Sequence, residues 1–174
     1  MKIKNLIINS LFLVVLLAAF SSCQKDDVDQ KESKTFTYDF NTGQINAAYA
    51  YDTNVGTHPT DLKAELMLEE MDNDMTKITV KLMNPVAGQT YMVHSHVKAD
   101  PNTTTNGTPY LETPDATVFA MPITAAEGEK SFTSNMSFEK LTTEYEAFLV
   151  VHDPLQNLTT TDPTTYVILG NFAR

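Results

Sequence analysis

The sequence predicts an all-β protein, built as an antiparallel sandwich or barrel. Short segments in which apolar and polar residues alternate recur along the chain, and clusters of turn residues separate them. After the N-terminal region, no segment has the sustained apolar stripe of an amphipathic helix. Cys23 is the only cysteine, so no disulfide can form within one chain. The fold must therefore be held by side-chain burial and backbone hydrogen bonds.

Residues 1–22 have the pattern of a secretory signal. Lys2 and Lys4 precede an apolar run at 6–20, which is too short to span a bilayer. Small residues then lead into Cys23, in a pattern that resembles the lipobox of bacterial lipoproteins. The resemblance implies cleavage before Cys23 and acylation of that cysteine, which would anchor the protein durably in a membrane. The alternative is an ordinary soluble export signal followed by an unrelated cysteine.

Residues 23–34 are expected to form a disordered tether, because this charged stretch contains almost no apolar side chain. Its beginning resembles the export signal by which Bacteroidota lipoproteins reach the outer face of the outer membrane; the matching residues are Gln24, Lys25, Asp26 and Asp27. The resemblance implies display on the cell exterior. The alternative is a solvated linker on a lipoprotein that stays in the periplasm.

Residues 35–174 are long enough for one domain with one hydrophobic core. Removal of residues 1–22 takes away two of the 12 basic residues and none of the 22 acidic ones, which leaves a formal net charge of −12. Such an acidic chain is a poor partner for nucleic acid, whose phosphates repel it. The sequence contains no glycine-rich phosphate loop and no Gly-x-Ser-x-Gly motif. These observations argue against the common nucleophilic and nucleotide-dependent enzymes.

The first half of the domain predicts strands at 35–40, 45–51, 62–70 and 75–83. The second of these is the weaker candidate. The third is ambiguous, because alternate leucines suit a strand but the composition also suits a helix. The segment that follows favours the strand: residues 71–74 form a turn pattern, and Ile78, Val80 and Leu82 share one face of the next segment. A hairpin explains both halves.

The second half begins with a turn at 84–88 and a strand that starts at Thr90. The stretch at 98–115 contains three prolines and five threonines and must be a long loop, a feature that is usually functional or mobile in a compact domain. Four further strands are predicted, at 117–123, 130–138, 144–152 and 164–172. The result is a series of short strands, as in antiparallel sandwiches.

Two of the four histidines lie on the strand that starts at Thr90. Alternate side chains of a strand share a face, so His94 and His96 point the same way, together with Met92. Their Cα atoms would lie about 6 to 7 Å apart, close enough for both imidazoles to reach one metal ion. His152 ends a later apolar strand and is a third candidate ligand. Copper accepts imidazole and thioether, so these side chains would suit it if they converge; a core methionine is the other interpretation of Met92.

The segment at 75–96, followed by the long loop and by Val150-Val151-His152, resembles the copper/zinc superoxide dismutases and the chordin-type (CHRD) domains. The resemblance covers about residues 62–174 through short motifs. It implies a single immunoglobulin-like, Greek-key β-sandwich, and it implies that His94, His96 and His152 are copper ligands. The alternative is that these histidines are structural polar residues, hydrogen-bonded to the backbone near one end of the sandwich.

Other parts of the dismutase site are missing from the sequence. No histidine lies between His96 and His152, so a zinc site is not expected, and the cysteines of the family's disulfide are absent. Arg174 follows a Gly-Asn segment similar to the one before the family's substrate-guiding arginine, but the spacing is one residue short. A copper-only enzyme acting on superoxide is therefore the weakest of the functional hypotheses. Copper binding leads, and a non-metal adhesion or protein-interaction module is the alternative.

Three further residues near the histidines have two interpretations each. Asp100 and Asp153 would either orient an imidazole by accepting its second N–H or serve as turn residues beside prolines. His58 is expected at the surface, and it would become a fourth ligand only if its loop folded over the site.

Overall fold

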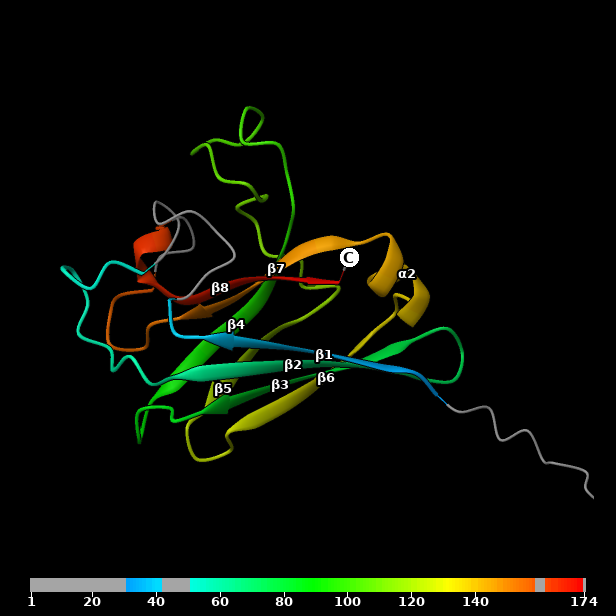
Figure 1. Cartoon of the computed structure of the whole chain (residues 1–174), viewed down its shortest axis with the longest axis horizontal. Helices are drawn as coiled ribbons and strands as arrows, with labels where there is room; N and C mark the ends of the chain where they lie inside the picture. Colours follow the sequence, from blue (N-terminus) through cyan, green and yellow to red (C-terminus); the bar gives the residue numbers. More distant parts are fainter. Residues whose placement is uncertain (1–30, 42–50, 159–161, 174) are drawn as a thin grey trace, which may run out of the picture. The chain divides into compact units, whose positions relative to one another are not determined.

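The computed structural model describes residues 31–41, 51–158 and 162–173, which belong to one compact unit that runs from Lys31 to Arg174 (Figure 1). The predicted signal, Cys23, the residues of the export signal and Arg174 lie outside the described residues, as does most of the strand predicted at 45–51. Among the described residues, no helix is both long and apolar enough to cross a membrane.

Eight strands form two antiparallel four-stranded sheets in the described part of the chain (Figure 1). The first sheet has the order β1-β2-β3-β6 and consists of β1 (Ser33–Asp39), β2 (Lys63–Glu70), β3 (Thr76–Met83) and β6 (Glu129–Ser134). The second has the order β5-β4-β7-β8 and consists of β4 (Thr90–Val97), β5 (Ala120–Thr124), β7 (Glu146–His152) and β8 (Tyr166–Ala173). The predicted all-β antiparallel sandwich is confirmed.

The hairpin of β2 and β3 shows why the ambiguous segment is a strand. Its register places Leu66 opposite Val80 and Leu68 opposite Ile78, and all four side chains are fully buried. A strand of alternating leucines puts every apolar side chain on one face. That face packs in the inner core, the large cluster of buried residues that also includes Tyr91 from the second sheet. Tertiary burial thus decides a choice that intrinsic propensity leaves open.

One helix interrupts the predicted series of strands. The strand predicted at 130–138 ends at Ser134, and α2 (Phe138–Thr143) follows. The Ser137 side chain accepts a hydrogen bond from the Lys140 backbone N–H, which caps the first turn of the helix. Phe138 and Leu141, three residues apart, are the buried side chains of this helix. The strand predicted at 130–138 was therefore too long, and the helix after it went unrecognised because six residues are too few for a visible apolar stripe.

Smaller differences concern where the strands begin. β1 starts at Ser33, within the segment predicted to be part of the tether, and β5 starts at Ala120 rather than at Thr117. The short 3₁₀ helix η2 (Pro163–Thr165) precedes β8, where the sequence predicted strand from Thr164.

Tyr38 connects the two sheets. Its hydroxyl donates a 2.7 Å hydrogen bond to the carbonyl oxygen of Asn171, so β1 of the first sheet contacts β8 of the second. The ring lies against Gly170, where an added Cβ would approach Tyr38 Cδ1 to 2.2 Å. Only glycine leaves room for this contact.

Candidate metal centre

The second sheet carries the histidines on its outer face, which is turned away from the first sheet. In β4 and β7, Val93 and Leu149 point into the inner core, so the alternate residues point outward. In the register of these strands, His94 lies opposite Val150 and His96 opposite Phe148. An irregularity between Val151 and His152 shifts the register of β7 against β8 and places His152 opposite Tyr166.

His94, His96 and His152, here called the histidine triad, come together in space. The ring centroids of His94 and His96 are 4.6 Å apart, and those of His94 and His152 are 4.8 Å apart. The Nε2 atoms of His94 and His152 are 2.6 Å apart, a hydrogen-bond distance between residues separated by 58 positions in the sequence. All three side chains are buried, with exposed fractions of 4% or less. The convergence that the sequence left open is therefore present in the structure.

The hydrogen bonds of His96 define which of its nitrogens is available. Its Nδ1 lies 2.6 Å from the carbonyl oxygen of Leu111. A carbonyl only accepts, so Nδ1 carries the proton, and Nε2 of the neutral ring presents a lone pair. This Nε2 is buried without a hydrogen-bond partner among the described residues. An outer hydrogen bond that sets the tautomer is typical of metal-binding histidines.

His94 and His152 share one proton between their facing nitrogens. Two neutral imidazoles in contact require one Nε2 to donate and the other to accept. The Nδ1 atoms of both rings are buried, and neither has a hydrogen-bond partner in the described part of the chain. Together with Nε2 of His96, three ring nitrogens of the triad lack a partner. Buried polar atoms without a partner are rare in native proteins and call for an explanation such as a bound ion or water.

Burial keeps the triad neutral at physiological pH. Burial, together with the neighbouring His96 and His152, lowers the pKa of His94 to about 3. Burial, followed by the effect of His96, lowers the pKa of His152 to about 4. Burial also lowers the pKa of His96, although the Leu111 carbonyl and the Glu112 carboxylate oppose this effect. The imidazoles are therefore in the unprotonated state that metal binding requires.

The long loop after β4 covers one side of the triad. The residues that lead from the loop back to β5 run along the edge of β4, past the point where its pairing with β5 ends. There the N–H of Leu111 donates to the Val97 carbonyl, and the N–H of Asp115 donates to the Ser95 carbonyl. In Figure 1 this loop, which leads in sequence from β4 to β5, projects at the top of the view near the β7 label. The loop thereby brings Tyr110 against the ring of His96, with 4.9 Å between centroids.

Sequence reasoning missed two tyrosines that flank the triad. Tyr110 packs beside His96, and the Tyr166 ring lies edge-on to His152 at 4.7 Å. Both tyrosines are about 99% buried. They belong to the outer cluster, a second group of buried side chains made of Tyr110, Phe148, Val150, Tyr166 and Leu169. The continuous apolar pattern of β7 was the available signal, because a strand buried on both faces must be covered by something on its outer side.

The other predicted site residues occupy different places. Met92 lies on the same strand face as His94 and is half-buried. The Asp100 carboxylate accepts hydrogen bonds from the backbone and side-chain N–H groups of Asn102, so it serves a turn. The Asp153 carboxylate accepts from the Tyr51 hydroxyl and from the Leu155 N–H. For both aspartates, these hydrogen bonds match the turn interpretation rather than the orientation of an imidazole.

The expectation that His58 lies at the surface is wrong. Its side chain is 4% exposed, and its Nε2 lies 2.8 Å from the hydroxyl of Tyr91, whose side chain is part of the inner core. Its Nδ1 lies 2.7 Å from the Pro59 carbonyl. Both nitrogens are therefore engaged on the opposite side of β4 from the triad, so His58 is not a fourth ligand.

The facing nitrogens of His94 and His152 stand closer together than two ligands of one metal ion. Two nitrogens that each lie about 2.0–2.1 Å from one ion are roughly 2.9–3.4 Å apart. The 2.6 Å between the facing Nε2 atoms is shorter, because a hydrogen bond joins them. As the side chains stand, no group of three or more His, Cys, Asp or Glu residues in the described ranges is arranged to hold a metal. Replacing the shared proton with an ion would require these two nitrogens to separate by about 0.3 to 0.8 Å.

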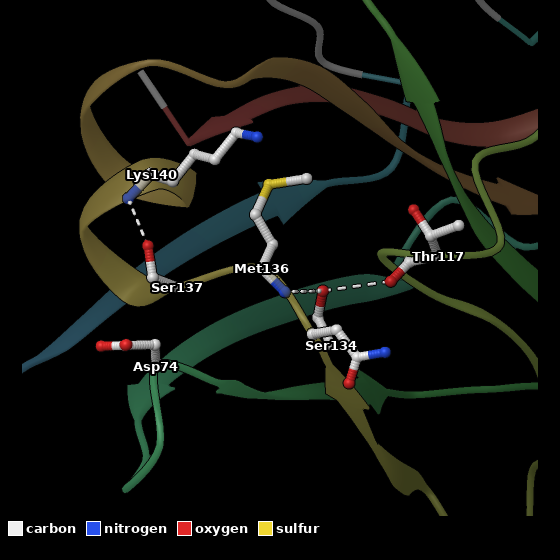
Figure 2. A pocket seen from close by; sticks show the side chains of 7 residues that line it. Asp74, Thr117, Ser134, Met136, Ser137 and Lys140 are labelled. Atoms are coloured by element: carbon white, nitrogen blue, oxygen red, sulfur yellow. Dashed lines mark hydrogen bonds between the residues drawn. The ribbon is translucent and has the colours of Figure 1, made fainter.

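A shallow pocket of about 430 Å³ lies elsewhere, around the start of α2, and is lined by Asp74, Thr117, Ser134, Asn135, Met136, Ser137 and Lys140 (Figure 2). Its hydroxyls are largely used for internal bonds. Ser134 Oγ donates to the Thr117 carbonyl and accepts from the Met136 N–H, while Ser137 Oγ caps α2. The pocket has no histidine and no partnerless buried polar atom in its lining. The triad is therefore the stronger candidate site.

Comparisons with models of protein families, with curated proteins and with solved structures found no match for this chain.

Proposed function

We propose that this protein is a membrane-anchored lipoprotein whose β-sandwich binds copper through His94, His96 and His152. The observation that carries the proposal is the convergence of three buried, neutral imidazoles: the Nε2 atoms of His94 and His152 face each other, and Nε2 of the adjacent His96 lacks a partner among the described residues. Imidazole is a good ligand for copper, and Met92 on the same strand face would add a thioether after a rearrangement. When bound, copper would supply a redox-active cation.

The protein's own contribution is to assemble and shield the ligands. Leu111 holds the tautomer of His96 through its carbonyl oxygen, and β7 delivers His152 through the irregularity at its end. Tyr110 and Tyr166 pack against the rings and exclude water from two sides. The resemblance to the dismutase and CHRD group supports the same ligand set, as part of the proposal.

The test is metal stoichiometry in a segment that contains the whole sandwich. All eight strands and both clusters of buried residues lie within Lys31–Arg174, and this segment leaves out the thiol of Cys23, which would bind copper by itself. After copper loading and desalting, we expect about one copper per chain, and less than about a tenth of that for His94→Ala. Bound metal is measured by atomic emission.

The matched control is His58→Gln, which removes a buried histidine outside the triad. This variant should retain the copper of the wild type. Equal loss of copper in both variants would mean that general destabilisation, and not ligand removal, explains the result. If the wild type retains no metal, the proposal fails, and the non-metal adhesion or interaction module becomes the better hypothesis. Superoxide turnover no faster than that of free copper would exclude the dismutase-like enzyme.

The membrane anchor is part of the same proposal and is supported by the lipobox-like sequence that ends at Cys23. In producing cells, labelled fatty acid should be incorporated into the full chain and not into the variant Cys23→Ala, as read from a gel. Protease added to intact cells should remove the domain if it faces the exterior. A protected domain would instead place it in the periplasm and would remove the role assigned to Gln24, Lys25, Asp26 and Asp27.

A further inference from the structure

We propose that the histidine triad selects Cu(I) over Cu(II) and Zn(II). This inference rests on the proposed function and specifies the oxidation state of the ion that the site retains. It follows from three features of the surroundings: the charges near the imidazoles, the apolar side chains around them, and the number of donors that the folded chain presents.

The first feature is the absence of a carboxylate in the hydrogen bonds that the triad makes among the described residues. The neighbour in sequence, Asp153, is buried, but its two oxygens accept from Tyr51, Leu155 and Gln156. Glu112 is half-buried and influences His96 through its charge, while its Oε1 accepts from the Asn106 N–H. A bound ion would thus be held by neutral ligands, none of which is hydrogen-bonded to a carboxylate among the described residues.

The second feature is the apolar character of the outer face. Val150 lies opposite His94, two residues before His152 in the same strand, and is fully buried. Leu169 lies opposite Val150 on β8 and is 7% exposed. The tyrosine rings cover His96 and His152. The cost of moving an ion from water into such surroundings grows with the square of its charge, so a dication is disfavoured about four times as strongly as a monocation.

The third feature is the donor count. The folded chain brings three imidazoles together, and Met92 would join them only after a rearrangement. Cu(I) is satisfied by about three nitrogen or sulfur ligands, whereas Zn(II) and Cu(II) require about four or more. The missing ligands of a dication would have to be waters, and a water needs about two to four polar partners of its own. The outer cluster, which consists of apolar and aromatic side chains, supplies few such polar partners.

The consequence is a site that stores or transfers reduced copper rather than cycling it. A site that binds Cu(I) tenfold more tightly than Cu(II) raises the reduction potential of the bound ion by about 59 mV relative to the free ion. Copper held in this way resists oxidation, which argues against rapid dismutation and favours a binding role.

The experiment is an anaerobic competition on Lys31–Arg174, with a chromophoric chelator of known affinity for Cu(I) and separate chelators for Cu(II) and Zn(II). We expect Cu(I) to bind at least tenfold more tightly than either dication, with all specific binding lost in His94→Ala. A smaller preference, or the reverse order, overturns the selectivity while leaving copper binding intact. If no ion binds at the triad, this inference and the proposed function fail together.

A variant tests whether the low charge and apolar surroundings of the triad cause its preference for Cu(I). Leu169→Glu adds a carboxylate beside Val150 at the position of the outer cluster that is most exposed to solvent. The preference for Cu(I) over Zn(II) should fall at least threefold in this variant, with circular dichroism confirming the fold. An unchanged preference in the folded variant overturns the argument from charge. If the variant does not fold, the competition on the wild type decides the question.

Discussion

Copper is expected to raise the free energy of unfolding of the sandwich by about 4 kcal/mol when its free concentration is about 1,000 times the dissociation constant. The physical reason is that the site exists only in the folded state. His94 and His152 are 58 residues apart in the chain, and the pairing of β4 with β7 brings them together. An unfolded chain presents isolated imidazoles of much lower affinity, so the ion stabilises the native state.

The measurement is urea denaturation of Lys31–Arg174 at a series of chelator-buffered Cu(I) concentrations. The midpoint should rise with the logarithm of free copper in the wild type and in His58→Gln, and should stay constant in His94→Ala. A midpoint that does not respond to copper in the wild type contradicts the prediction. A rise of the same size in His94→Ala would show that copper binds elsewhere on the fold.

Without metal, the domain is expected to lose stability as the pH falls below about 6.5. The pKa values of His94 and His152 drop from 6.5 to about 3 and about 4 on folding, mainly because burial disfavours the charged form. At a pH between the folded and the unfolded pKa of each histidine, the unfolded chain binds more protons than the folded chain. Stability is therefore complete above pH 6.5 and decreases toward pH 4, by up to about 1.4 kcal/mol per pH unit for each histidine.

This dependence can be separated from the titration of carboxylates, which occurs mainly below pH 5. The free energy of unfolding would be measured in chelator at pH 7.5, 6.5 and 5.5, for the wild type and for His152→Leu. The leucine variant should show a shallower decrease, because one of the two strongly shifted groups is gone. Identical slopes would mean that the buried imidazoles do not control acid stability.

Much of the fold follows from local patterns. Alternate leucines in β2, followed by the turn at 71–74 and the alternating β3, favour a hairpin, and burial of the leucine face in the inner core decides it. The short α2 was not predictable in the same way. It depends on a serine cap and on two apolar side chains, and so short a helix is stabilised by packing rather than by its own sequence.

In the candidate site, too, some features follow from the local sequence and others depend on the tertiary structure. The spacing of His94 and His96 on one strand determines that they share a face, because side chains alternate along any strand. The sequence by itself also determines the acidic charge, the single cysteine and the number of imidazoles available. These properties are local or compositional, so no tertiary information is needed to read them.

Only the tertiary structure decided which distant residues join the pair. The register of β4 with β7 and the irregularity before His152 bring that histidine in, whereas His58 is held on the opposite side of β4 by Tyr91. The loop after β4 adds Tyr110 to the site. The physical reason is that strand pairing and loop closure are set by the burial of whole faces, a property of the assembled sheets that no single segment of the sequence contains.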